Sequence, residues 1–230
     1  MMNTLYKTIE NYMLSQMTDS AHDPHHIYRV LNTAKDIAAH EMANGTPCDM
    51  AVLIAACLLH DIGRNQQFAN PSLCHAEVGG KMAFEFIMSQ LQCDPAANAV
   101  RHTPLWQGWN EAKAVHVQDC ISSHRYRGDN RPQSIEAQIL FEADKIDACG
   151  IIGIARTLLY AGKVDHPIYI LDESGHVKTT GNSDSFVQEY HHKLKNIDKA
   201  LNTARAKEIA AIRQRASQDF YHALISEISG

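Results

Sequence analysis

The fold is decided by the stretch AVLIAACLLHDIGR, residues 51–64. Its first nine residues are uninterrupted apolar side chains, a segment that is stable only when buried in a core. Asp49 is well suited to begin a helix and Gly63 to follow its end, so the sequence predicts one buried helix between them. His60 and Asp61 then lie in the last turn of that helix, held in place by the packed core.

An imidazole followed directly by a carboxylate at the end of a buried helix suggests a metal ion. Adjacent helical residues point about 100° apart, so His60 and Asp61 can flank one ion together, but neither can hold it alone. A divalent cation of hard or borderline character accepts imidazole nitrogen and carboxylate oxygen together. The remaining ligands must therefore come from elsewhere in the chain.

Length and composition set the frame for this site. The chain has 230 residues, of which 45% are apolar and 20% charged, values typical of a soluble globular protein. We expect a single domain over residues 1–230, with its core at about 21–160 and a loop or hairpin plus C-terminal helices at 161–230. The net charge of −5 gives no electrostatic reason to expect a nucleic acid polymer as a partner.

Cysteine usage and hydropathy indicate the compartment. The six cysteines are scattered without a C-x-x-C pair, so free thiols in a reducing compartment are a simpler interpretation than a disulfide framework. The N-terminus has no basic-then-apolar signal pattern, and no stretch approaches the about 18 apolar residues of a membrane span. We therefore expect a cytoplasmic protein without a membrane partner, and the sequence indicates no oligomeric state.

Apolar residues recur at helical spacing through most of the chain, which predicts an all-α fold with little or no strand. The polar residues 65–71 are expected to form a loop at the rim of a site. The segment 168–180 is expected to form a small hairpin or an ordered loop, and the tryptophans near 103–110 either a lid or a hydrophobic plug. The expected helices cover residues 1–17, 24 to a break at 44–47, 49–63, 75–91, 114–124, 134 to beyond 150, and 186 to about 228 with a bend.

Two further residues can complete a ligand set with His60 and Asp61. His26 falls in the first turn of its helix, and Asp144 falls on an apolar helix stripe, where an unpaired charge is costly. Each also has an ordinary structural interpretation, His26 as a surface or capping histidine and Asp144 as the partner of Lys145 or an arginine. From the residues alone, a metal site and a set of unrelated side chains both remain open. Two imidazoles and two carboxylates leave open positions on an octahedral ion, which suits Mn²⁺, Fe²⁺ or Mg²⁺ better than structural Zn²⁺.

The order H…HD…D resembles the HD superfamily of metal-dependent phosphohydrolases, and in particular its YedJ-like bacterial subgroup. The resemblance covers nearly the whole chain except the segment 103–110. It rests on AHDPHHIYRV at 21–30, LLHDIG at 58–63, ISSHRYR at 121–127, FEADKIDACG at 141–150, and the region from HHKL at 191–194 to NTAR at 202–205. It implies an all-helical fold, hydrolysis of phosphate esters or anhydrides, in some members of nucleotides, and a divalent metal ion held by His26, His60, Asp61 and Asp144.

The resemblance also implies residues around the ion. In two-metal members, extra histidines between the HD pair and the last aspartate bind the second ion. Here His75 and His124 are available without a clear double-histidine motif, so we expect one ion. The catalytic candidates are then Asp61, His75, His124 and Arg125, with Asp61 or Asp147 orienting the water and the histidines contacting phosphate or moving a proton. By residue type, the substrate-binding candidates are Arg29, Arg64, Lys81, Arg127, Lys145 and Asp147. Taken singly, the cations Arg29, Lys81, Arg125 and Arg127 are also consistent with solvated surface charges, and Arg64 with the rim of the site.

We therefore predict a metal-dependent phosphohydrolase acting on a small phosphorylated metabolite, for which a nucleotide is one candidate. One alternative is a phosphodiesterase that uses the same ion on a diester. The other is a nucleotide-sensing module that keeps the metal and catalyses no reaction. Substrate choice is expected to depend on the loops around 65–75 and 103–112.

Overall fold

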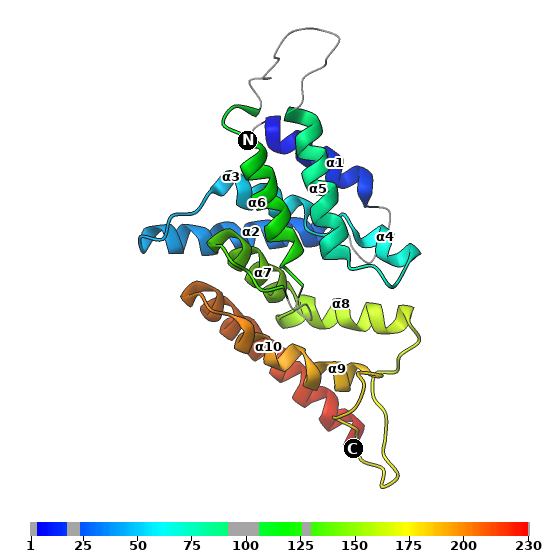
Figure 1. Cartoon of the computed structure of the whole chain (residues 1–230). Helices are drawn as coiled ribbons and strands as arrows, with labels where there is room; N and C mark the ends of the chain where they lie inside the picture. The colour runs from blue at the N-terminus through cyan, green and yellow to red at the C-terminus, as the bar shows by residue number, and fades with distance from the viewer. Residues whose placement is uncertain (1–3, 18–23, 92–105, 126–129, 230) are drawn as a thin grey trace. The chain divides into compact units, whose positions relative to one another are not determined.

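The computed structural model describes residues 4–17, 24–91, 106–125 and 130–229 (Figure 1). Within them the chain is helical, which confirms the all-α prediction, and the segment expected to form a hairpin contains one isolated antiparallel bridge, between Leu171 and Val177. The elements are α1 (Thr4–Gln16), α2 (Pro24–Ala43), α3 (Met50–Leu59), α4 (Arg64–Ala69), α5 (His75–Leu91), α6 (Glu111–Ser122), α7 (Ile135–Asp147), α8 (Gly150–Lys163), α9 (Phe186–His192), the 3₁₀ helix η2 (Leu194–Ala200) and α10 (Ala204–Ser229).

The chain divides into two compact units, residues 1–141 and 142–230. Helix α7 begins in the first unit and ends in the second. The single domain expected over 1–230 stays a prediction. Among the described helices, none combines the length and apolar character that crossing a membrane requires.

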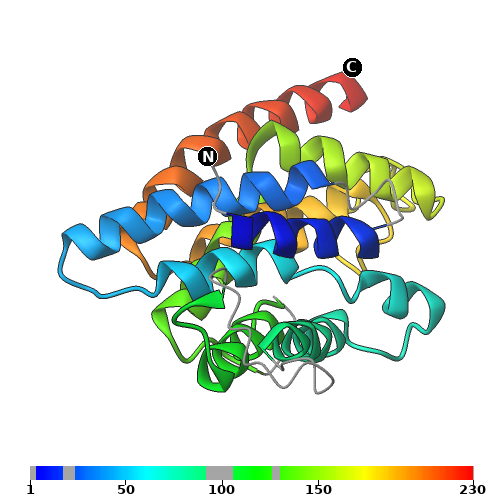
Figure 2. The same ribbon diagram turned by 90° about the horizontal axis from the view of Figure 1, so that it is seen from above.

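Helix α3 is the centre of the first unit. Eight of its ten residues are buried, and it packs against α1, α2 and α6 (Figure 1). Figure 2 shows α2 running alongside α3 from above. The predicted cap is confirmed, because Asp49 Oδ1 accepts hydrogen bonds from the backbone N–H groups of Ala51 and Val52 at 3.0 and 3.2 Å. The apolar run therefore forms the buried helix that the sequence predicted.

The end of α3 differs from the prediction. The helix stops at Leu59, His60 is its C-cap, and residues 60–63 form a turn. Gly63 has an ordinary φ of −81°, so it does not end the helix through a left-handed conformation. It is a glycine because a Cβ there would lie 2.6 Å from the backbone nitrogen of Gly79 and still closer to the carbonyl oxygen of His75. The turn after α3 thus lies directly against the start of α5.

The prediction of a loop over residues 65–71 is wrong for most of that range, because helix α4 occupies residues 64–69 with Gly63 as its N-cap. A six-residue helix with no buried residues has no apolar stripe, so helical periodicity does not reveal it. The close contact of Gly63 with α5 sets where α4 begins. The chain between α4 and α5 is therefore shorter and more constrained than the sequence suggested.

Helix α5 lies beside α6 (Figure 1), and the tryptophans pack at this pair. Trp106 and Trp109 are 2% and 8% exposed, with ring centroids 5.2 Å apart. The ring of Phe86 on α5 lies 6.4 Å from Trp106. The described part of the tryptophan segment is thus a hydrophobic plug, and residues 103–105 lie outside the described residues.

The long helix predicted from about residue 134 is broken near its middle in the structure. Helix α7 ends at Asp147 and α8 begins at Gly150, whose φ of +75° is the left-handed region that favours glycine. The prediction of one helix past 150 is therefore wrong. Helix α10 packs on α8 and on η2, so the predicted C-terminal helix is present as α9, η2 and α10 with breaks between them. The five cysteines of the described ranges are free thiols, and Cys93 lies outside these ranges.

Candidate functional site

Five polar side chains are buried together in the first unit, each at most 3% exposed. They come from four separate places in the chain: the first turn of α2, the turn that ends α3, the first residue of α5, and the segment just after α6. These residues are His26, His60, Asp61, His75 and His124. Within the first unit the fold therefore gathers three of the predicted metal ligands and both predicted catalytic histidines, and the fourth predicted ligand, Asp144, is a residue of the second unit.

The Asp61 carboxylate is the centre of the cluster. Its Oδ2 lies 3.7 Å from Nε2 of both His26 and His60. Its Oδ1 lies 3.7 Å from Nε2 of His75 and 3.6 Å from Nε2 of His124. These separations are too long for direct hydrogen bonds, but they match ligand atoms that share one ion, which lie about 3–4 Å from each other.

The hydrogen bonds of two imidazoles define their tautomers. Nδ1 of His60 lies 2.8 Å from the carbonyl oxygen of Cys57, and Nδ1 of His124 lies 2.6 Å from that of Ile121. A carbonyl oxygen can only accept, so Nδ1 donates in both rings, and in a neutral ring Nε2 carries the lone pair. Both lone pairs therefore face the Asp61 carboxylate.

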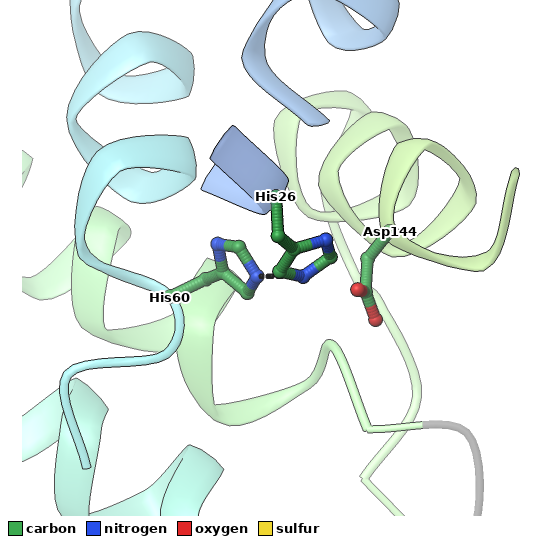
Figure 3. Close-up of side chains that lie close together, drawn as sticks. All are labelled: His26, His60 and Asp144. Carbon is green, nitrogen blue, oxygen red and sulfur yellow. Dashed lines mark hydrogen bonds between the residues drawn. The ribbon is translucent and has the colours of Figure 1, made fainter. Parts of the chain in front are cut away.

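Lone pairs aimed at a carboxylate are favourable only with a cation or a proton between them. Nε2 of His60 faces Nε2 of His26 at 3.4 Å, the dashed line in Figure 3, which also labels Asp144 of the second unit. Asp61 Oδ2 is buried and accepts no hydrogen bond from the described residues. His60, Asp61 and His124 each offer a ligand atom, and these atoms lie within 4.8 Å of one another. The donor set thus fits a divalent cation.

Arg64 determines the charge state of the centre. Its Nε donates to Asp61 Oδ1 at 2.9 Å, so this predicted substrate-binding residue lies on the carboxylate itself. Burial raises the pKa of the Asp61 carboxyl, but the Arg64 guanidinium and the nearby imidazoles outweigh burial and hold it well below its usual range. Asp61 is therefore ionised wherever the protein is folded near neutral pH.

Other predicted residues of the first unit lie in varied surroundings. Arg125 is half-buried, and its Nη1 donates to Cys74 Sγ at 3.4 Å. Arg29 is half-buried on α2. The side chain of Lys81 is 76% exposed and lies 3.9 Å from Glu85 Oε1, so it is not gathered into the cluster. Arg127 lies outside the described residues.

The predicted residues of the second unit form ion pairs. Lys145 Nζ lies 2.6 Å from Asp144 Oδ2, which is the pairing that the sequence left open for this aspartate. Asp147 is 1% exposed and accepts a hydrogen bond from Arg156 Nη1 at 2.6 Å. The Asp147–Arg156 pair joins the end of α7 to α8.

One residue of the site was missed from the sequence. Gln67 of α4 lies with its Oε1 3.0 Å from Nδ1 of His75. It falls in the stretch predicted to be a loop, where a glutamine carries no signal of its own. The available signal was indirect. His75 is the first residue of its helix, so no carbonyl of that helix precedes it, and a partner for its Nδ1 has to come from another part of the chain.

A family model matches about half of the chain, and individual relatives match nearly all of it. The model of the HD domain family matches residues 25–149. The uncharacterized protein YpgQ of Bacillus subtilis is 27% identical over 226 residues, which are 96% of this chain and 93% of that protein. Its crystal structure in complex with ADP aligns with a TM-score of 0.65 at 22% identity, covering 98% of each chain. The structure of the Lin1889 protein of Listeria innocua aligns with a TM-score of 0.67 at 25% identity, covering 98% of this chain and 96% of that protein. The structure of an HD-superfamily hydrolase of Bacillus thuringiensis aligns with a TM-score of 0.65 at 24% identity, covering 99% of this chain and 97% of that protein.

Proposed function

Because the chain belongs to the HD domain family, we propose that it is a metal-dependent phosphohydrolase acting on a small phosphorylated metabolite, with nucleotides as the leading candidates. The observation that carries the proposal is the buried Asp61 carboxylate, which is ringed by imidazole nitrogens and whose Oδ2 accepts no hydrogen bond from the described residues. The superfamily inferred from the motif order is confirmed, whereas the YedJ-like subgroup stays a prediction.

The ion would be held at Asp61 Oδ2, with Nε2 of His26 and His60 on the same side of the carboxylate. We assign Asp144 as the remaining protein ligand from its place in the last motif. A single ion is favoured because Oδ1 already accepts from the Arg64 guanidinium, and a second cation there would be repelled. When bound, Mn²⁺, Fe²⁺ or Mg²⁺ supplies Lewis-acid activation of a water and of a phosphoryl oxygen.

The remaining chemistry falls to the side chains around Asp61. His75 and His124 face Oδ1 through Nε2, a position from which an imidazole can move a proton. Asp61 keeps its charge and orients the water. Arg125 offsets charge on the transferring phosphoryl group. The candidates for holding the rest of the substrate are Arg29, Arg64, Lys81, Arg127, Lys145 and Asp147.

Two observations support the finer parts of the proposal. A nucleotide substrate is supported by YpgQ, a relative over 96% of this chain that has been crystallised with ADP. A cytoplasmic location is supported by the free thiols of the described cysteines, which suit a reducing compartment.

The test is a substrate panel with metal-loaded protein. Nucleoside mono-, di- and triphosphates, a sugar phosphate and bis(p-nitrophenyl) phosphate are incubated with Mn²⁺, Mg²⁺ or Fe²⁺, and released phosphate, pyrophosphate or nitrophenol is measured. We expect hydrolysis of at least one nucleotide, abolished by chelation and restored by metal. Turnover of the diester alone would instead favour the phosphodiesterase. Saturable nucleotide binding without any turnover would favour the sensing module and overturn the proposal.

A further inference from the structure

We propose that Gln67 is a positioning residue that selects the tautomer of His75 and links it to the loop of residues 70–74. The consequence for catalysis rests on the function proposed above, in which His75 acts at the Asp61 centre. The tautomer itself follows from the hydrogen bonds of the folded chain.

The other two oriented histidines obtain their Nδ1 acceptors from their own helices. His60 and His124 follow the ends of α3 and α6, and each donates to the carbonyl three residues earlier, at Cys57 and Ile121. The last four carbonyls of a helix have no partner within the helix, so these acceptors are available without any further side chain. A histidine placed just after a helix is therefore oriented by the backbone alone.

His75 cannot be oriented in this way, because it is the first residue of α5. The residue three positions earlier, Ser72, lies in the preceding turn and not in a helix. The acceptor is instead a side chain from another helix, Gln67 Oε1 of α4, at 3.0 Å from Nδ1. The orientation of His75 thus depends on an amide that the chain must itself hold in place.

The loop holds that amide in one orientation. Gln67 Nε2 donates to the carbonyl oxygen of Leu73 at 3.1 Å, and a carbonyl can only accept. The oxygen of the amide must then be the atom that faces His75, so His75 donates from Nδ1. In the neutral ring, Nε2 then carries the lone pair, 3.7 Å from Asp61 Oδ1.

The elements around this contact are closely packed. Gly63, the N-cap of α4, has no room for a Cβ against the His75 carbonyl and Gly79, so the starts of α4 and α5 lie together. In the loop, Asn70 Oδ1 accepts from the Ser72 N–H and hydroxyl at 3.2 and 2.7 Å, and the Leu73 N–H donates to the Asn70 carbonyl at 3.0 Å. This folded loop presents the Leu73 carbonyl to Gln67.

A change in the loop would therefore reach the site. If the Leu73 carbonyl moves away, the amide of Gln67 can rotate and present its NH₂ group to His75. Nδ1 would then accept, the ring proton would lie on Nε2, and a hydrogen-bond donor would replace the lone pair facing Asp61. The loop predicted to shape substrate choice is in this way coupled to the protonation pattern of His75.

The experiment compares Gln67→Met with Gln66→Met in the metal-free protein. Gln66 is the matched control, because it lies on the same helix and its Oε1 has no hydrogen-bond partner among the described residues. Imidazole ¹H–¹⁵N correlation spectra are recorded at one alkaline pH, and the His75 signals are identified by their loss in His75→Gln. We expect His75 protonated at Nδ1 in the wild type and in Gln66→Met, and a mixed or Nε2-protonated ring in Gln67→Met.

Gln67→Glu serves as the conservative variant, because its carboxylate keeps an acceptor for Nδ1. It should retain the wild-type tautomer, and circular dichroism should show that all variants fold. An unchanged tautomer in Gln67→Met overturns the inference, whatever the activity. On the substrate identified by the panel, Gln67→Met should lose about 10–100-fold in rate, as for other outer-shell partners. A substrate panel without turnover would defeat the proposed function and leave the tautomer measurement valid.

Discussion

Two groups of charged and polar side chains among the described residues, one in each unit, are built in opposite ways. In the first unit, Asp61 and the imidazoles around it are buried and face one another through nitrogen and oxygen atoms 3.6–3.7 Å apart. In the second unit, Lys195, Lys207 and Arg215 line a groove of about 490 Å³ beside Asp198, and all four side chains are exposed.

The difference shows that a groove lined by charged side chains is not by itself evidence of a binding or catalytic site. Exposed cations are screened by solvent and lose conformational entropy when they converge on a ligand, so each contributes about 0–1 kcal/mol. The buried residue of the groove, Gln214, donates to the Leu194 carbonyl at 2.6 Å and so serves the packing of α10 on η2. At the Asp61 centre the donors are oriented before any ligand arrives. We therefore expect function at the buried centre and little at the groove.

The largest effect is expected for Asp61→Asn. Removing the charge takes away the common partner of the imidazole nitrogens and of Arg64. We expect metal binding to be lost and kcat/KM to fall by more than the about 100-fold typical of an outer-shell partner. The measurement is metal content by elemental analysis beside kcat/KM, with circular dichroism to confirm folding.

Asp198→Asn in the groove is the matched control for Asp61→Asn, since it removes the same charge from an exposed position. It should retain both metal and turnover. A folded Asp61→Asn protein with full metal content would contradict the assignment of the carboxylate as a ligand.

A smaller effect is expected for Arg64→Met. The substitution keeps much of the side-chain length but removes the donor to Asp61 Oδ1. Because Arg64 holds the carboxylate in orientation, metal affinity should fall by about 10–100-fold. Lys81→Met, which changes an exposed cation, is the control and should leave metal affinity unchanged. A change confined to KM in Arg64→Met would instead return Arg64 to the substrate side.

The sequence predicted those parts of the fold that depend on local pattern. The apolar run of α3, its Asp49 cap and the pairing of His60 with Asp61 all lie within one short stretch. It did not predict the break after Asp147, because the apolar spacing continues past Gly150 and a left-handed φ leaves no trace in that spacing. Gly63 was identified as important, but for the wrong reason, since its contact is with residues of α5.

The site was predicted as a set of residues and not as an arrangement. That Asp61 is the hub depends on contacts with α2, α5 and the end of α6, which only the folded chain brings together. The role of Gln67 was missed for the same reason, because α4 has no buried stripe to indicate a helix. Residue type and order can identify candidate ligands. Only the folded structure shows which of the two Asp61 carboxylate oxygens faces which side chain.

A few-fold effect is expected at Cys74, beside the buried centre. Burial raises the pKa of the Cys74 thiol, but the N–H groups of Glu77 and Ala76 and the Arg125 guanidinium outweigh burial and bring it below its usual value. At Cys48 and Cys120, by contrast, burial is the largest effect and raises the pKa of each thiol to about 12. Iodoacetamide should therefore modify Cys74 before Cys48 and Cys120 as the pH is raised, as located by peptide mass spectrometry.

The contact with Arg125 can be tested in the same assay. Arg125→Gln should slow alkylation of Cys74 about two- to fivefold near neutral pH, the equivalent of less than about 1 kcal/mol for a partly exposed charge. Lys81→Gln removes a cation without this contact and should leave the rate unchanged. Equal alkylation rates of Cys74 in the wild type, Arg125→Gln and Lys81→Gln would show that Arg125 does not stabilise the thiolate.

The smallest effect is expected at the groove of the second unit. The double variant Lys207→Gln/Arg215→Gln removes two exposed cations that form no ion pair within the described parts of the chain. Surface changes of this kind alter stability by about 0.5 kcal/mol or less, so the melting temperature should stay within a few degrees. Metal content should be unchanged and kcat/KM should stay within twofold, because neither charge belongs to the buried centre. A rise in KM of tenfold or more with kcat intact would break the comparison, since an exposed, screened groove would then be taking part in substrate binding.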